Sequence, residues 1–194
     1  MRQELERHVE WGGAVWVEQV ERGLEWLGDV RGLRILDVGA RYGGTSTLFG
    51  QLGAEVVGID TDAAALEFAR DRALGAGLAD RVRFEHRSGD PDDLPRQFDV
   101  VFTKSVLVIV PDLAATLAGL ASALVDGGRL LMVENGRGPA IVHAARMIRR
   151  RSLHPHGANY FTNASLPIIR RHFDVQLEHW TRFPPTLVVG AVRR

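Results

Sequence analysis

The 194-residue chain has the length and composition of one globular domain, with 45% hydrophobic and 25% charged residues. Its 24 basic and 24 acidic residues balance to a formal net charge of zero, which argues against a dedicated nucleic-acid binder. The absence of cysteine excludes disulfides, thiolate zinc sites and cysteine nucleophiles. The apolar runs are too short to cross a bilayer and the charged first ten residues do not read as a signal peptide, so we expect a cytoplasmic protein.

Short apolar runs alternate with helix-like stretches along most of the chain. The apolar runs predict five strands, at 33–38, 55–59, 82–86, 98–102 and 129–133. The stretches between them predict helices at 45–52, 62–75 (with Asp62 as its cap) and 113–124. Continuously apolar strands that alternate with helices are typical of a parallel sheet covered on both faces.

Two more strand-like runs, at 173–182 and 186–192, are separated only by Phe183-Pro184-Pro185. A connection this short cannot be a parallel crossover, so the two runs must form an antiparallel hairpin. The sequence therefore predicts a doubly wound, mostly parallel seven-stranded α/β sheet (Rossmann-like) with an antiparallel C-terminal hairpin.

We expect a single domain over residues 1–194, with an N-terminal helical segment at 1–30. Residues 135–172 break the alternation, and we interpret them as a lid or substrate-facing insertion. This insertion contains predicted helices at 139–151 and 164–171 with a polar stretch between them.

Three acidic residues follow consecutive strands, at the edge where open α/β sheets bind ligands. Asp37 precedes a glycine-rich turn, where glycines let the backbone approach a phosphate or carboxylate closely. Asp60 ends the second strand, 23 positions after Asp37, which is near the spacing of a ribose-binding acid. Asp90 follows the third strand and could accept from an exocyclic amine. Read singly, these are also ordinary turn, cap or loop residues; strand-end position and spacing favour ribose for Asp60.

Together the segments resemble the class I S-adenosylmethionine (SAM) dependent methyltransferases, particularly the group acting on small molecules, over nearly the whole chain. The first motif of that family resembles LDVGARYG, its ribose motif VVGIDTD and its adenine-side motif SGDPDDLP. Its fourth strand, helix and fifth strand are similar to the stretch from FDVVF to RLLMVE, and its final hairpin to FPPTLVVGAVRR.

The resemblance implies SAM as cofactor, with S-adenosylhomocysteine (SAH) as its product. The backbone from Gly39 to Gly43 would hold the methionine end, Asp60 the ribose and Asp90 the adenine amine. Thr61 would flank the adenine, and Thr103 with Lys104 would lie near the sulfonium. The complete expected cofactor set is Asp37, Gly39, Ala40, Arg41, Gly43, Asp60, Thr61, Gly89, Asp90, Pro91, Thr103 and Lys104.

The sequence departs from the family pattern in two places. Arg41 stands where the family usually has its middle glycine, so the loop is expected to be shaped differently while still binding SAM through its backbone. Val108-Ile109 stands where many relatives carry histidines, so no acid/base group is offered there.

An acceptor that must lose a proton needs a base, and histidine suits this role because its pKa lies near neutrality. Of the insertion histidines we favour His154 and His156 over His143 as catalytic candidates, while each is also a plausible solvated loop residue. The His154-Pro155-His156 pair lacks a third ligand at a convincing spacing, so no metal site is expected. The basic run Arg146–Arg151 is either a solvated helix face or a site for an anionic substrate or partner.

Four aromatic residues have two readings: Trp11, Trp16 and Trp26, with Phe161, either line an acceptor pocket or anchor the N-terminal helices on the core. The residues after the fourth strand, Thr103 to Val106, lack the Asn/Asp-Pro-Pro-aromatic signature of enzymes that methylate nucleic-acid amines. No acid set for a magnesium-dependent catechol-type enzyme is evident either. We therefore expect O-, N- or C-methylation of a small-molecule acceptor, without a membrane or nucleic-acid partner; a homodimer is left open.

Two alternatives remain. A nicotinamide-dependent oxidoreductase shares the glycine loop and the acid after the second strand. Against it stand the Asp90 motif, the C-terminal hairpin and the lack of a Tyr-x-x-x-Lys pair. The second alternative is a non-catalytic protein that retains the fold.

Overall fold

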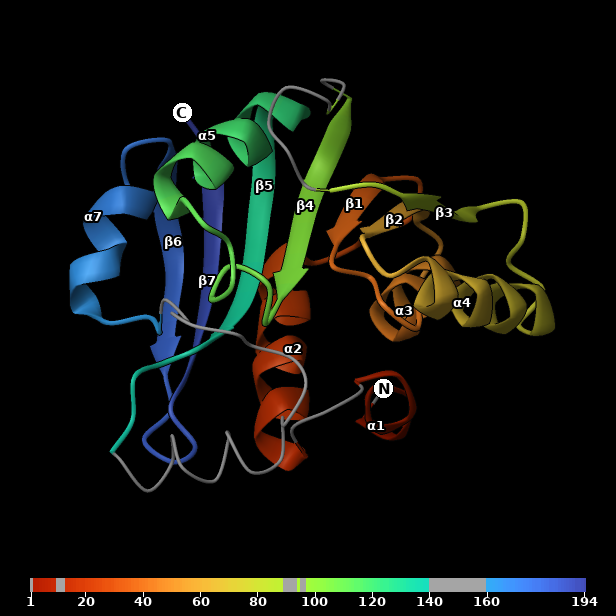
Figure 1. Ribbon diagram of the computed structural model, residues 1–194, viewed down its shortest axis with the longest axis horizontal. Helices are drawn as coiled ribbons and strands as arrows, with labels where there is room; N and C mark the ends of the chain where they lie inside the picture. Colours follow the sequence, from red (N-terminus) through yellow and green to blue (C-terminus); the bar gives the residue numbers. More distant parts are fainter. Residues whose placement is uncertain (1, 10–12, 89–93, 95–96, 140–159) are drawn as a thin grey trace.

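The computed structural model describes residues 2–9, 13–88, 94, 97–139 and 160–194 (Figure 1). The strands are β1 (Arg34–Val38), β2 (Glu55–Asp60), β3 (Val82–His86), β4 (Phe98–Lys104), β5 (Leu124–Asn135), β6 (Phe173–Trp180) and β7 (Thr186–Arg193). The helices are α1 (Arg2–His8), α2 (Ala14–Leu27), α3 (Gly44–Gln51), α4 (Ala63–Gly75), α5 (Leu113–Ala123) and α7 (Leu166–Ile169), with a 3-10 turn η2 at Asn163–Ser165.

All seven strands form one sheet in the order β3-β2-β1-β4-β5-β7-β6. Strands β1 to β5 pair in parallel, whereas β7 runs antiparallel to both β5 and β6. This confirms the predicted mostly parallel sheet and its terminal hairpin. The chain builds outward from β1 in one direction and from β4 in the other. The switch point between β1 and β4 is where ligands bind in sheets of this type.

Helices cover both faces of the sheet (Figure 1). One core is formed by apolar residues of α1, α2, α3 and α4 on one face, and the second by residues of α5 and α7 on the other. Because both faces are buried, the strands need apolar residues at successive positions. That requirement explains why they appear in the sequence as unbroken apolar runs.

The predicted element boundaries agree with the structure where local chemistry defines them. Asp62 caps α4 as predicted, since its carboxylate accepts from the Ala65 N–H at 3.0 Å. Asp112 caps α5 in the same way, through the Ala114 and Ala115 N–H groups at 2.9 and 3.0 Å.

Two predicted elements differ from the structure: the fifth strand is longer than predicted, and the helix predicted at 164–171 is divided. β5 begins at Leu124, directly after α5, and continues to Asn135, because Gly127 takes a left-handed φ of 70° and the strand passes through this irregularity. The glycines there allow the bend without ending the strand. The single helix predicted at 164–171 is a 3-10 turn followed by one short α-helix, with Thr162 in a capping box at its start.

Apart from Pro139, the helix predicted at 139–151 lies outside the described residues. Among the helices that the structure describes, none is both long and apolar enough to span a bilayer.

Candidate functional site

The glycine loop connects β1 to α3 at the switch point of the sheet. Gly39, Arg41 and Gly43 all have left-handed backbone angles, with φ of 77°, 48° and 73°. The N–H groups of Gly39 and Ala40 donate to the Ile59 carbonyl at 2.8 and 3.0 Å, which joins the loop to the end of β2. Arg41 therefore adopts a left-handed backbone conformation that glycine ordinarily adopts, and this conformation has an energetic cost for a residue with a side chain.

Asp60 lies half-buried at the end of β2, beside this loop. Its Oδ2 accepts from the Arg41 N–H at 2.9 Å and its Oδ1 accepts from the Asp62 N–H at 2.9 Å. A carboxylate oxygen has more than one acceptor position, so both oxygens retain capacity for a ligand. Asp60 thus holds the glycine loop in place and still offers a carboxylate at the edge of the sheet.

Asp37 lies beneath the loop and is 2% exposed. Its Oδ2 accepts from the Ser46 and Thr45 hydroxyls, at 2.6 and 2.8 Å, which fixes the first turn of α3 to the end of β1. Burial raises the pKa of Asp37, opposed by these two hydrogen bonds and by the nearby positive charge of Lys104. The N-terminus of α3 is therefore held at the loop, and free N–H groups at a helix N-terminus can bind an anion.

Lys104 ends β4, next to the loop. Its ammonium group lies 5.6 Å from the centre of the Trp16 ring, and Trp16 itself is 5% exposed. Trp16 is thus part of the core and also the platform beneath Lys104. The other two described aromatic residues also pack in the structure: Phe161 is fully buried, and a side chain at Gly190 would collide with Trp26.

Thr103 points into the protein, because its fully buried hydroxyl donates to Glu134 Oε1 at 3.1 Å. The same oxygen accepts from the N–H groups of Val106 and Leu107 at 3.2 and 3.1 Å. Burial raises the pKa of Glu134 to about 7. The next residue, Asn135, donates to the Ser105 hydroxyl at 2.6 Å.

Sequence reasoning placed residue 135 at the start of the insertion and did not identify this cluster. The available signal was an acidic and an amide residue at the end of an otherwise apolar strand. In a sheet of this kind that position faces the ligand-binding edge.

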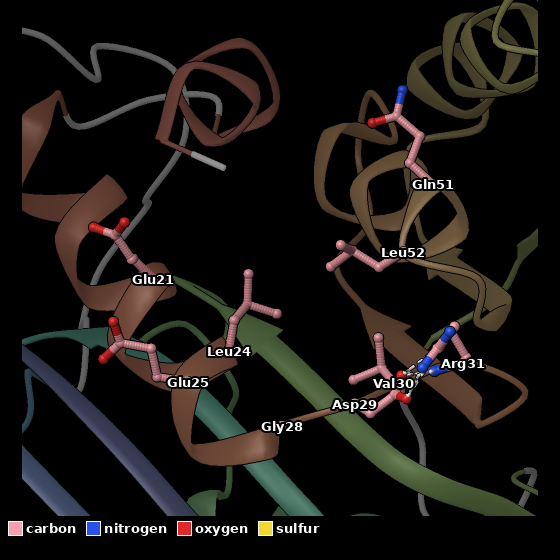
Figure 2. A pocket seen from close by; sticks show the side chains of 9 residues that line it. All are labelled: Glu21, Leu24, Glu25, Gly28, Asp29, Val30, Arg31, Gln51 and Leu52. Atoms are coloured by element: carbon pink, nitrogen blue, oxygen red, sulfur yellow. Dashed lines mark hydrogen bonds and ion pairs between the residues drawn. The ribbon is translucent and has the colours of Figure 1, made fainter.

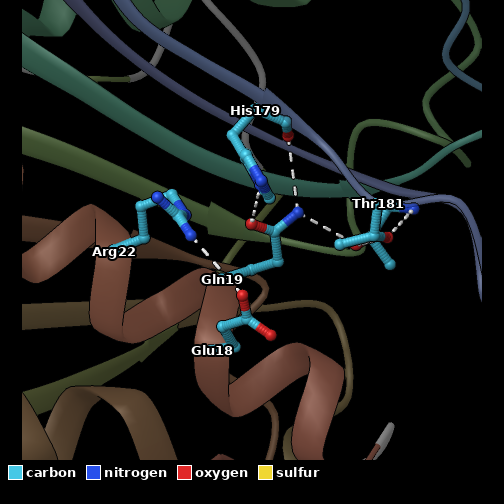
Figure 3. A network of polar contacts seen from close by, with 6 residues as sticks. Glu18, Gln19, Arg22, His179 and Thr181 are labelled. Atoms are coloured by element: carbon cyan, nitrogen blue, oxygen red, sulfur yellow. Dashed lines mark hydrogen bonds and ion pairs between the residues drawn. The ribbon is translucent and has the colours of Figure 1, made fainter.

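A second buried polar network fixes α2 to the C-terminal hairpin (Figure 3). Gln19 is fully buried, and its Nε2 donates to Thr186 Oγ1 at 3.1 Å and to the His179 carbonyl at 3.4 Å. Its Oε1 therefore accepts from His179 Nδ1 at 3.0 Å. The Thr181 hydroxyl lies 2.7 Å from that of Thr186 and completes the network. Because Thr186 pairs with Asn135 of β5, the network supports the same edge of the sheet.

Several predicted site residues are less well placed or are not described. Thr61 is exposed, and its carbonyl accepts from His86 Nε2 at 3.0 Å. Others lie outside the described residues: Trp11, Gly89, Asp90, Pro91, His143, the run Arg146–Arg151, His154 and His156. The adenine-side contacts and the catalytic histidines therefore stay predictions.

A cavity of about 690 Å³ opens at the opposite end of the sheet, where α2 ends and β1 begins (Figure 2). Its floor is apolar and its rim is largely acidic, and none of the predicted site residues lines it. The lining residues are Glu21, Leu24, Glu25, Gly28, Asp29, Val30, Arg31, Gln51 and Leu52. Asp29 and Arg31 are already paired with each other, at 2.6 Å. Ligands of doubly wound sheets bind at the carboxyl ends of the strands, so this cavity is not the candidate site.

The candidate site is therefore the edge formed by the ends of β1, β2 and β4. It combines backbone N–H groups at a helix N-terminus with two carboxylates on adjacent strands. Such an arrangement suits a ligand with an anionic end and a neighbouring pair of hydroxyl groups.

Comparison with known proteins finds related methyltransferase sequences and, among solved structures, the same fold. A methyltransferase-domain family matches residues 36–130. The chain is 33% identical over 162 residues to the ubiquinone biosynthesis O-methyltransferase of Xanthomonas euvesicatoria pv. vesicatoria, across 77% of this chain and 65% of that protein. It is 36% identical over 124 residues to the protein of the same name from Aeromonas salmonicida, across 60% of this chain and 50% of that protein.

A solved S-adenosylmethionine dependent methyltransferase from Mesorhizobium loti has the same fold, with a TM-score of 0.76 at 21% identity. The match covers 94% of this chain and 99% of that one. The matched region spans only about half to two thirds of the length of the two curated relatives above.

Proposed function

We propose that the chain is a class I SAM-dependent methyltransferase and transfers the methyl group of SAM to a small-molecule acceptor, as its sequence relatives and its fold support. The observation that supports this most strongly is the arrangement at the switch point. The left-handed loop from Gly39 to Gly43, the N-terminus of α3 and the Asp60 carboxylate meet at one edge. This arrangement favours the interpretation of these residues as a cofactor-binding set over their interpretation as unrelated turn residues.

The residues present fit this cofactor by their chemistry. Asp60 is half-buried and has spare acceptor capacity for two adjacent ribose hydroxyls. The first turn of α3 offers N–H groups to a carboxylate, and Asp37 beneath it anchors that turn. SAM brings its own leaving group when bound. The protein must therefore align the acceptor and exclude water, and it supplies a base only if the acceptor loses a proton.

The name shared by the two curated relatives favours an oxygen acceptor, and O-methylation is the specific form of our proposal. We further propose that residues 135–172 cover the acceptor and that His154 or His156 takes its proton. The cytoplasmic location and the homodimer that the sequence leaves open belong to the same set of predictions.

The cofactor proposal is tested by calorimetric titration of the protein with SAM, SAH and NADH. We expect SAM and SAH to bind and Asp60→Ala to weaken SAH binding by about 10- to 100-fold, since hydrogen bonds to a charged group contribute about 1.5–3 kcal/mol. Asp60→Asn keeps the shape of the side chain and one acceptor oxygen, so its affinity for SAH should fall between those of the wild type and Asp60→Ala. The matched control is Glu55→Ala, at the exposed opposite end of the same strand, which should leave binding unchanged.

Circular dichroism would establish that each variant is folded. Binding of NADH alone would replace this proposal with the oxidoreductase alternative. Absence of binding by any of the three ligands would favour the non-catalytic alternative.

A further inference from the structure

The loop that follows β4, residues 105–108, is held almost entirely by the end of β5. Ser105 has a left-handed φ of 60°, an uncommon angle for a residue other than glycine, and its hydroxyl accepts from the Asn135 amide. The next two N–H groups, of Val106 and Leu107, both donate to Glu134 Oε1. Two successive residues of one strand thus determine the path of this loop.

This loop is in direct contact with the glycine loop. A Cβ atom placed on Gly39 would lie 2.1 Å from Val106 Cγ2, so the two loops touch with no room for a side chain between them. Any displacement of Val106 therefore changes the packing of the glycine loop. Glu134 contacts loop 105–108 directly, through the Val106 and Leu107 N–H groups, and acts on the glycine loop through Val106.

The Glu134 carboxyl group is unequally satisfied. Oε1 accepts three hydrogen bonds, while Oε2 is buried and has no partner among the described residues. The whole residue is 0% exposed. A buried carboxylate with a bare oxygen is costly, and protonation of that oxygen removes the charge without disturbing the three bonds to the other.

We propose that Glu134 is a positioning residue whose protonated carboxyl group keeps loop 105–108 closed against the glycine loop, and whose ionisation favours release of the loop into water. The role of the loop in cofactor binding rests on the function proposed above, whereas its response to the Glu134 proton does not. The residue acts on the cofactor through the loop and is not a catalytic residue.

The groups around Glu134 do not titrate, so the pH response of loop 105–108 depends on the proton of Glu134 itself. The groups that act on its pKa, on β4 and in the loop, are the Thr103 hydroxyl and the N–H groups of residues 106–108, all uncharged. Its partner on β7 is the apolar Leu187. Lys104, the neighbouring charge on β4, is directed to Trp16 of α2, whose helix covers the other face of the sheet.

The direction of the effect follows from linkage. Burial raises the pKa of Glu134 from 4.5 to about 7 in the closed loop, whereas an opened loop would return the carboxyl group to water and to its ordinary pKa. The conformation with the higher pKa is favoured at low pH. With these two values, opening becomes about tenfold more favourable between pH 6 and pH 8.

Hydrogen exchange of the Val106 and Leu107 amides, followed by NMR, tests this directly and needs no ligand. Protection is expressed relative to the intrinsic exchange rate at each pH. In the wild type we expect protection of both amides to fall about tenfold from pH 6 to pH 8. In Glu134→Gln, which keeps the acceptor oxygen but cannot ionise, protection should not change with pH. Equal pH dependence in the two proteins, or none in the wild type, would overturn the proposal.

The positioning role is tested separately by SAH affinity at pH 6. Glu134→Ala removes the acceptor and should weaken SAH binding at least about tenfold, while Glu134→Gln should restore it to within about twofold of the wild type. Met132→Ala, a buried truncation on the same strand, is the control that loses core packing and should leave the affinity of the folded protein unchanged. Equal losses in Glu134→Ala and Met132→Ala would reduce Glu134 to a structural residue.

Failure of this inference and failure of the proposed function are distinguishable. If the wild type binds no SAH, the proposed function fails while the exchange experiment still decides whether the loop responds to the Glu134 proton.

Discussion

At Gly39 two independent constraints act on one residue. The backbone φ of 77° lies in the region that L-amino acids with a side chain adopt only at a cost of about 1–2 kcal/mol. In addition, a Cβ atom would collide with Val106. Gly77 meets only the first constraint, because it has a φ of 70° but nothing within 4 Å of the position of its Cβ.

We therefore predict that Gly39→Ala destabilises the protein by about 3 kcal/mol and Gly77→Ala by about 1 kcal/mol, as measured by urea unfolding. Adding Val106→Ala to Gly39→Ala should recover part of the loss, because it removes the colliding methyl group but not the backbone cost. An equal loss in the two glycine variants would mean that Val106 simply moves aside.

Arg41 keeps the turn although it stands where the methyltransferase family that the chain resembles usually has glycine. Its φ of 48° is left-handed, and its N–H donates to Asp60, so the backbone performs the function for which the family uses glycine. The guanidinium group lies 5.0 Å from the centre of the Tyr42 ring, which is a cation–π contact. The strained position is compensated by the hydrogen bond and the ring contact.

At the level of elements, α2 packs on the sheet through an apolar face that contains one buried polar side chain, Gln19. Its buried residues Trp16, Val17, Val20, Leu24 and Leu27 pack in the core, and Gln19 alone reaches the hairpin through hydrogen bonds. Removal of one member of a buried network leaves the others without partners, which costs about 1–3 kcal/mol.

We accordingly expect Gln19→Leu to lower the free energy of unfolding by about 2 kcal/mol, because His179 Nδ1 loses its partner and the Thr186 hydroxyl keeps only its bond to Thr181. Glu18→Ala, on the adjacent exposed position of the same helix, should cost less than about 0.5 kcal/mol, since its ion pair with Arg22 is exposed to water. Both values come from urea unfolding monitored by tryptophan fluorescence. A neutral Gln19→Leu would show that apolar packing alone holds α2 in place.

For the whole molecule, buried carboxyl groups determine how stability depends on pH. Glu134 has its pKa raised to about 7 and Asp37 also has its pKa raised, both through burial. The folded protein therefore binds these protons more tightly than the unfolded chain does. Their contribution to stability is complete below the ordinary pKa of a carboxyl group and is lost as pH rises to the folded-state value.

We predict that the wild type loses up to about 3 kcal/mol relative to Glu134→Gln between pH 4.5 and pH 7.5, because one pKa unit corresponds to about 1.4 kcal/mol. Urea unfolding of both proteins across this range measures the difference and cancels the contribution of every other group. A difference that does not vary with pH would show that Glu134 titrates normally in the folded protein.

The sequence by itself determined the features of this protein that depend on neighbours along the chain. Apolar runs marked the strands, Asp62 marked the start of α4, and the three-residue connection at 183–185 required the antiparallel hairpin. The motifs predicted acids at the ends of β1 and β2, and the structure has Asp37 and Asp60 at those strand ends. These features are local because propensities, caps and turn lengths act over a few residues.

Only the tertiary structure decided what depends on residues far apart in the chain. It placed β7 between β5 and β6, turned Thr103 inward and buried Glu134 under a loop nearly 30 positions earlier in the chain. It also joined Gln19 to His179, 160 residues away. Strand order, burial and pKa arise from packing between elements, and no pattern of neighbouring residues specifies which face of a strand a distant segment will cover.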